Sequence, residues 1–120
     1  MLDHIGLRTK RLDGLVKFYE AALKPLGYAK LAAYEGGAGF GKGDSPRLWL
    51  GASKEAPSSV HVAIESPTRK AVEAFHAAAL AAGAKDNGKP GIRADYGANY
   101  YAAFVIDPDG NNLEAVCMKA

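Results

Sequence analysis

The chain has 120 residues, 48% of them apolar and 23% charged, and its formal net charge is +2. This composition is typical of one globular domain with a real core, and the dispersed charge argues against nucleic acid as a partner. No run approaches the roughly 18 apolar residues of a membrane-spanning helix. The single cysteine, Cys117, cannot form an internal disulfide, and the N-terminus lacks the apolar core of a signal peptide, so we expect a cytoplasmic protein.

The first part of the chain, about residues 1–52, predicts the order βαβββ. A short strand at 2–7 precedes a helix that begins near Leu12 or Asp13 and is closed by Pro25 and Gly27. Strands are expected at 28–34, 38–42 and 47–51, between turns of glycine, proline, aspartate and serine. The stretch 36–43 resembles a phosphate-binding loop in spacing. Because Gly43 replaces the Ser or Thr and no helix follows, we expect a hairpin there.

The second part, about residues 60–118, predicts the same order again. A strand opens at His61, Ser66 as a cap followed by Pro67 predicts the start of a helix that ends near Gly83, and strands are expected at 85–89, 100–106 and 112–118. An offset of 57 residues places His4 on His61, so the chain carries an internal duplication. The expected fold is α+β, with two tandem βαβββ units, each a curved half sheet with one helix, in one domain over 1–120.

Glu114 is the central candidate for a functional residue. It follows a turn at 107–111, and strand alternation places it on one face with Asn112 and Val116. A buried carboxylate must be paired or bind a metal, and His4 and His61 stand at the heads of two other strands. These three residues could form a divalent-metal site suited to zinc, nickel, iron, manganese or cobalt, with Glu114 as the catalytic group. The alternative is three separate polar residues at strand ends.

Other side chains are candidates for contacts with a small-molecule substrate. By the repeat, Trp49 holds the first-unit position that matches Glu114, and the polar and aromatic loop 93–101 runs into the strand before Glu114. The alternative for the loop is an ordinary surface loop. The expected substrate contacts are Trp49, Arg93, Tyr96, Asn99 and Tyr101. His76 lies on the core stripe of the second helix and is expected to be packed and hydrogen-bonded, and Cys117 is expected to be a core residue rather than a nucleophile.

These features together resemble a known family. Two tandem βαβββ units, a histidine on the first strand of each, the helix sequence Phe-Tyr-Glu-Ala-Ala-Leu at 18–23 and Asp-Pro-Asp-Gly-Asn-Asn-Leu-Glu at 107–114 look like the vicinal oxygen chelate superfamily. That superfamily includes glyoxalase I, extradiol dioxygenases, and bleomycin and fosfomycin resistance proteins. The resemblance implies curved half-barrel sheets and a metal bound by His4, His61 and Glu114. Trp49 departs from the four-ligand pattern of glyoxalase I, and the remaining set is more like that of the dioxygenases.

Two functions follow as hypotheses. The first is a small divalent-metal-dependent enzyme of glyoxalase-like type, a lyase, isomerase or dioxygenase, whose metal acts as a Lewis acid on vicinal substrate oxygens. The alternative is a metal-free ligand-binding protein of the antibiotic-resistance type, which cups an aromatic ligand against Trp49. We expect a homodimer with shared sites, because the connection 53–59 reaches at most about 25 Å and restricts how one unit folds back on the other.

Overall fold

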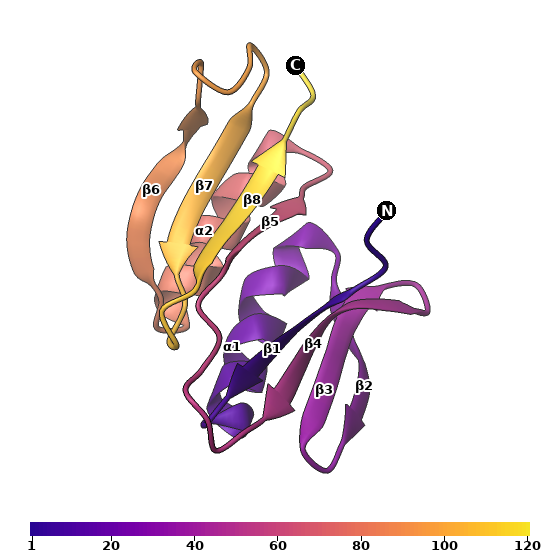
Figure 1. The fold of residues 1–120 in the computed structure, drawn as a ribbon. Coiled ribbons are helices and arrows are strands. Elements are labelled where there is room, and N and C mark those ends of the chain that lie inside the picture. The colour runs from indigo at the N-terminus through magenta and orange to yellow at the C-terminus, as the bar shows by residue number, and fades with distance from the viewer.

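Two copies of one element order make up the chain in the computed structural model, which describes residues 1–120 (Figure 1). Unit one comprises β1 (Ile5–Thr9), α1 (Leu12–Leu23), the 3-10 helix η1 (Lys24–Leu26), β2 (Ala29–Tyr34), β3 (Gly37–Lys42) and β4 (Ser45–Ala52). Unit two comprises β5 (His61–Glu65), α2 (Arg69–Ala81), β6 (Lys85–Ile92), β7 (Tyr101–Ile106) and β8 (Asn112–Cys117). The predicted α+β fold with two tandem units is confirmed.

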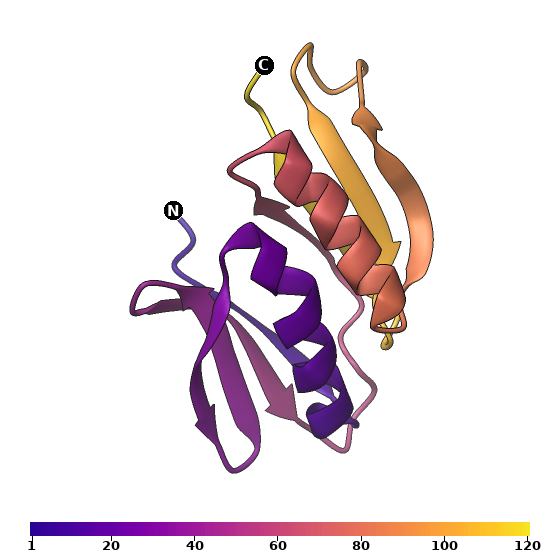
Figure 2. The same ribbon diagram turned by 180° about the vertical axis from the view of Figure 1, so that it is seen from behind.

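The two units have the same sheet topology. The strand order is β1-β4-β3-β2 in one sheet and β5-β8-β7-β6 in the other, so β1 and β5 are edge strands. In each sheet the first strand pairs in parallel with the fourth, and the other pairs are antiparallel. Helices α1 and α2 contact each other and lie on one side of the molecule, and the opposite face of both sheets carries no helix (Figures 1 and 2). We call that opposite face of each sheet its open face.

The core lies between each sheet and its helix and continues where α1 meets α2. Helix α1 buries side chains at helical spacing, and strand residues facing the helices complete a cluster of 20 buried apolar residues drawn from both units. Burial of this amphipathic face, rather than intrinsic propensity, is the main source of stability for helices of this length. Cys117 lies fully buried in this cluster, as predicted. Neither helix has the length and apolar composition needed to cross a membrane.

Helix α2 begins later than the sequence indicated. Thr68, rather than Ser66, is the N-cap residue, because its extended backbone lets Oγ1 accept a hydrogen bond of 3.0 Å from the Ala71 N–H. The Ser66 hydroxyl is used differently, since it donates to the Thr68 carbonyl at 2.8 Å. The predicted Ser66-Pro67 start is therefore wrong by two residues, and Pro67 precedes the cap.

Strand bounds also differ from the prediction, most at one end of β1 and of β6. Strand β1 begins at Ile5, so His4 precedes it, and β6 runs on to Ile92 through Pro90. A proline can lie in β6 because this strand is at the edge of its sheet and its pairing with β7 is interrupted between Gly88 and Gly91. The glycine-rich stretch forms the β2–β3 hairpin, as predicted, and no helix follows it.

His76 is packed and hydrogen-bonded, as its place on the core stripe predicted. Its Nε2 lies 2.9 Å from Asp86 Oδ1, and its side chain is almost fully buried under β6. The Gly88 N–H and His76 both hold the pKa of Asp86 below its usual range, the backbone hydrogen bond more strongly than the histidine. This pair fixes α2 against the sheet and lies away from the open face.

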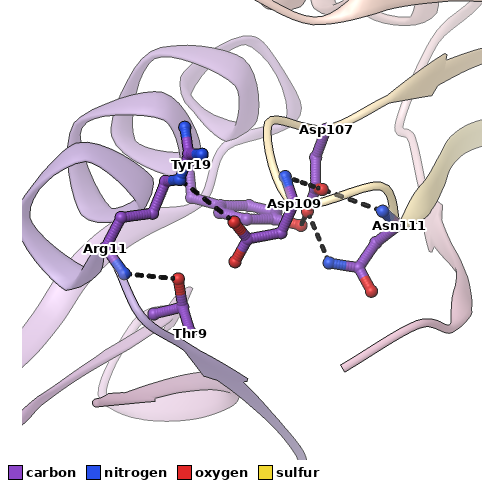
Figure 3. A network of polar contacts seen from close by, with 6 residues as sticks. All are labelled: Thr9, Arg11, Tyr19, Asp107, Asp109 and Asn111. Carbon is purple, nitrogen blue, oxygen red and sulfur yellow. Dashed lines mark hydrogen bonds and ion pairs between the residues drawn. The ribbon is translucent and has the colours of Figure 1, made fainter. Parts of the chain in front are cut away.

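A buried polar network joins the β7–β8 turn of unit two to unit one (Figure 3). The Tyr19 hydroxyl of α1 donates to Asp107 Oδ2 at 2.5 Å, and the Asn111 side-chain amide donates to the same oxygen at 2.9 Å. Asp107 Oδ1 accepts from the N–H groups of Asp109 and Asn111. Beside them, Arg11 Nε lies 3.4 Å from Asp109 Oδ1. The turn that precedes β8 is therefore held in register with the first helix.

Candidate functional site

Glu114 is a buried carboxylate on the open face of unit two. In the sheet it lies opposite Ala63 of β5 and Phe104 of β7, at the centre of the four strands. Its neighbours Leu113 and Ala115 point the other way and belong to the core. Only 1% of Glu114 is exposed, although no helix covers this face. A carboxylate so placed requires partners that offset its loss of water.

Two side chains supply these partners. His61 Nε2 lies 2.8 Å from Glu114 Oε1, and the Tyr100 hydroxyl donates to Glu114 Oε2. Burial, and then the hydrogen bond and charge of Glu114, raise the pKa of Tyr100 to about 12, so this phenol keeps its proton at neutral pH. About half of the His61 side chain is exposed, so the imidazole end of the pair is open to solvent.

His4 lies in a different setting. It precedes β1, is exposed, and places Nδ1 2.8 Å from Asp3 Oδ1. That contact, and then the Arg47 charge, hold the pKa of Asp3 below its usual range. His4 and His61 both line a cleft of about 350 Å³ between the edges of β1 and β5. Within one chain, however, no three His, Cys, Asp or Glu side chains converge closely enough to hold a metal ion. The chain therefore brings His61 to Glu114 but does not bring His4 to them.

Trp49 occupies the position in unit one that Glu114 occupies in unit two. Trp49 pairs with Gly6 across β1 and β4, and Glu114 pairs with Ala63, which is the residue matching Gly6 in the internal repeat. The indole lies against Gly39, where an added Cβ would come within 2.8 Å of its ring, and its centroid is 6.4 Å from that of the Tyr34 ring. The open face of unit one is therefore aromatic where that of unit two carries a carboxylate.

The loop residues proposed as substrate contacts are divided between the two faces of the sheet. Arg93 stacks on Phe104, the strand neighbour of Glu114, and Tyr96 packs edge-on against Tyr100 with its ring centroid 5.2 Å away. Both therefore lie beside the His61–Glu114 pair. Asn99 is exposed and makes no side-chain hydrogen bond.

Tyr101 lies on the other face. It pairs with the core residue Cys117, and its hydroxyl donates to Glu73 Oε2 of α2 at 2.6 Å. The structure therefore places Tyr101 against the helix and away from Glu114. The residues that sequence reasoning did not identify are Tyr100 and Phe104. The pairing of Ile106 with Asn112 around the turn sets the register that brings Phe104 opposite Glu114, and counting back from the turn would have found both.

The family is shown by comparison with known proteins. The model of the Glyoxalase/Bleomycin resistance protein/Dioxygenase superfamily matches residues 1–115, and the chain belongs to this superfamily. No curated protein gives a significant match. A glyoxalase/bleomycin resistance protein from Albidiferax ferrireducens has the same fold, with a TM-score of 0.84 at 24% identity over 98% of both chains. A family enzyme from Burkholderia phytofirmans gives 0.74 at 17% identity, again over 98% of both chains.

A larger protein shares the fold as well. A mutant of glyoxalase I from Zea mays aligns with a TM-score of 0.70 at 25% identity, over 96% of this chain and 46% of that one. This chain therefore corresponds to about half of that enzyme. The resemblance drawn from the two histidine strands and the C-terminal motif is confirmed at the level of the superfamily.

Proposed function

We propose that this protein is a small divalent-metal-dependent enzyme of the glyoxalase-like type. The observation that carries the proposal is the His61–Glu114 pair, a buried carboxylate and a half-exposed imidazole 2.8 Å apart on an open sheet face. Imidazole nitrogen and carboxylate oxygen are the donors that zinc, nickel, iron, manganese and cobalt accept. The residues present therefore fit such an ion, with two donors in one chain.

In this proposal, His61 and Glu114 hold the ion, and Tyr100 keeps the Glu114 carboxylate in its orientation through the second oxygen. A bound divalent ion would supply Lewis-acid stabilisation to two neighbouring oxygens of a substrate. The chain's own part is to fix the donors, to exclude water around a carboxylate that is 1% exposed, and to keep the Tyr100 proton on its phenol. Lyase, isomerase and dioxygenase reactions are all compatible with this arrangement. A cytoplasmic location is part of the proposal, supported by the buried free thiol of Cys117.

We propose His4 of a second copy as the third donor, in a homodimer with two equivalent sites. Both open faces lack a helix (Figures 1 and 2). The single chain leaves His4 apart from the other two donors. A two-fold pairing of unit one with the partner's unit two would place an exposed histidine over each His61–Glu114 pair. The substrate is then a small molecule bound between the two open faces.

Metal analysis tests the proposal. We expect protein purified without chelator or polyhistidine tag to carry one divalent ion per chain, and His61→Ala and Glu114→Gln to lose it while their circular dichroism stays unchanged. Asp13→Asn is the control, because Asp13 is an exposed carboxylate on α1, on the helix side of the molecule, and forms no ion pair. Equal metal content in Glu114→Gln and wild type would remove Glu114 from the site.

A metal-free ligand-binding protein is the second candidate. One observation favours it: both Glu114 oxygens already have partners in the chain, and Trp49 and Tyr34 form an aromatic surface on unit one. In that case the purified protein contains no stoichiometric ion, and an aromatic ligand perturbs the fluorescence of Trp49. Addition of zinc, nickel, iron, manganese or cobalt salts would then leave the affinity for that ligand unchanged.

A further inference from the structure

Arg93 is a fixed positive charge on the open face of unit two. Its Nη1 donates to the Gly91 carbonyl at 3.1 Å and its Nη2 donates to the Lys89 carbonyl at 2.6 Å. The guanidinium carbon lies 5.3 Å from the centroid of the Phe104 ring, in a cation–π contact. Three separate contacts therefore hold a side chain that normally samples many rotamers. A ligand that binds Arg93 loses little affinity to ordering this side chain, because the side chain is already ordered in the free protein.

The backbone of β6 leaves space for this guanidinium. A Cβ at Gly88 would come within 3.1 Å of Arg93 Nη2 and 2.9 Å of the Phe104 ring, and a Cβ at Gly91 would come within 3.3 Å of Arg93 Nη1. Gly88 also has a φ of 155°, a backbone conformation that residues with a side chain rarely adopt. The regular pairing of β6 with β7 is interrupted here. Gly88 and Gly91, at an interruption of the strand pairing, therefore leave space beside the backbone for the Arg93 guanidinium.

The charge of Arg93 has no carboxylate to neutralise it. The arginines that form ion pairs are those at 8, 11 and 47, and no carboxylate oxygen lies within 4.0 Å of the Arg93 guanidinium. A guanidinium has five N–H donors, and Arg93 uses two of them on carbonyls. The remaining donors can bind a carboxylate or phosphate in the bidentate geometry that arginine favours.

Arg93 is also placed at a defined position relative to Glu114. Its backbone N–H donates to the Tyr100 carbonyl at 2.8 Å, and the hydroxyl of the same tyrosine donates to Glu114. Phe104, whose ring contacts the guanidinium, pairs with Glu114 across β7 and β8, and its ring centroid lies 6.2 Å from that of His61. The guanidinium, an apolar ring and the His61–Glu114 pair therefore follow one another along the open face.

We infer that Arg93 is the binding position for an anionic group of the substrate, which is a small organic acid. Its carboxylate or phosphate pairs with Arg93, its apolar or planar body covers Phe104, and its neighbouring oxygens reach the His61–Glu114 pair. The last part rests on the proposed function. The anion position does not, because it depends on contacts that involve neither His61 nor Glu114.

The first experiment measures anion binding to chelator-treated protein. Inorganic phosphate and acetate are titrated at constant ionic strength, with glycerol as the neutral control, and the Arg93 Nε–H signal and the Phe104 amide are followed by NMR. We expect saturable shifts with both anions and none with glycerol, and a loss of affinity of about tenfold or more in Arg93→Gln. Arg93→Lys keeps the charge without the planar fork and is expected to bind with intermediate affinity.

Arg69→Gln is the matched control. Arg69 also stacks on an aromatic ring, that of Tyr101 at 5.1 Å, but from the helix-covered face of the same sheet. Anion binding that is unchanged in Arg93→Gln, or lost equally in Arg69→Gln, would overturn the inference, whatever the metal content of the protein. The relative affinity of phosphate and acetate identifies the group that the position prefers.

The second experiment links the anion position to the proposed metal site. Catechol and protocatechuate, which is catechol with a ring carboxylate, are titrated into cobalt-loaded protein. We expect wild type to bind the carboxylated probe about tenfold more tightly and Arg93→Gln to bind both equally. If cobalt does not bind while Arg93-dependent anion binding remains, the metal proposal fails and the anion position stands. Equal affinities for both probes in cobalt-loaded wild type would overturn the assignment of the substrate as an organic acid.

Discussion

The hydroxyl of Tyr19 and the carboxylate of Asp107 form the most deeply buried polar contact between the two units, a hydrogen bond of 2.5 Å. Burial, and then the Asp107 charge, raise the pKa of Tyr19 far above its usual range. The proton therefore stays on the phenol, which always acts as the donor. Because Asp107 opens the turn that leads into β8, this bond connects the first helix to the strand that carries Glu114.

Replacing Tyr19 by Phe should destabilise the protein by about 1–3 kcal/mol, since Asp107 Oδ2 then loses a partner in a buried setting. Urea unfolding measured by circular dichroism gives the change. Tyr28→Phe is the control, because the Tyr28 hydroxyl makes no hydrogen bond in the structure and its loss should cost less than about 0.5 kcal/mol. Equal midpoints for Tyr19→Phe and wild type would show that the contact contributes nothing to stability.

Replacing Tyr100 by Phe should weaken divalent-metal binding about 10- to 100-fold without loss of the fold. The hydroxyl holds Glu114 Oε2, and removing a partner of this kind frees the carboxylate to reorient. Isothermal titration with zinc or nickel provides the measurement. Tyr96→Phe is the matched control, since Tyr96 packs on Tyr100 but is mostly exposed and makes no side-chain hydrogen bond. Should both variants bind metal alike, Tyr100 does not support the site.

The same tyrosine predicts a change in stability at alkaline pH. Its pKa in the folded protein is raised to about 12, whereas a free tyrosine ionises at about pH 10. The folded state therefore holds the proton more tightly, so this contribution to stability is fully present below about pH 10 and is lost as the pH rises through about 12. The stability difference between wild type and Tyr100→Phe should be constant from neutral pH to about pH 10 and then shrink. Unfolding midpoints across this range would contradict the assignment if the difference grew.

A mixed dimer tests whether sites are shared between chains. One chain carries His4→Ala, and the other carries His61→Ala and Glu114→Ala, with different affinity tags so that the mixed species can be isolated. If each site takes His4 from one copy and His61 with Glu114 from the other, the mixed dimer has one intact site and binds about half of the wild-type metal. If each chain contains its own complete site, the mixed dimer binds none.

The sequence indicated the fold because local periodicity and the internal repeat agree. Helical spacing located α1 and α2, and the repeat correctly aligned Trp49 with Glu114, which the strand pairings confirm. Strand alternation also separated Glu114 from Leu113 and Ala115 correctly. Each of these inferences uses only the chain's own spacing, so no information about tertiary packing was required.

The details of the candidate site depend on relations between segments. Tyr100 and Tyr101 are chemically identical neighbours, and only the register of β7 against β8 decides which of them reaches Glu114. The setting of His4 depends on how the two sheets are placed side by side, which a repeat of equal spacing does not specify. Similarly, Ser66 and Thr68 are both good N-cap residues by type. Thr68 is the N-cap because its extended backbone precedes the first helical residue.

Trp49 is the only tryptophan of the chain, and it lies half-buried on the open face of unit one over Gly39. The tryptophan emission of the protein therefore arises at a single known place, outside the core cluster and in the other unit from the His61–Glu114 pair. Any molecule or second chain that covers this face removes water from the indole and shifts its spectrum toward the blue. Trp49 fluorescence therefore reports on the open face of unit one, and dimer dissociation on dilution or ligand binding can be followed without a label.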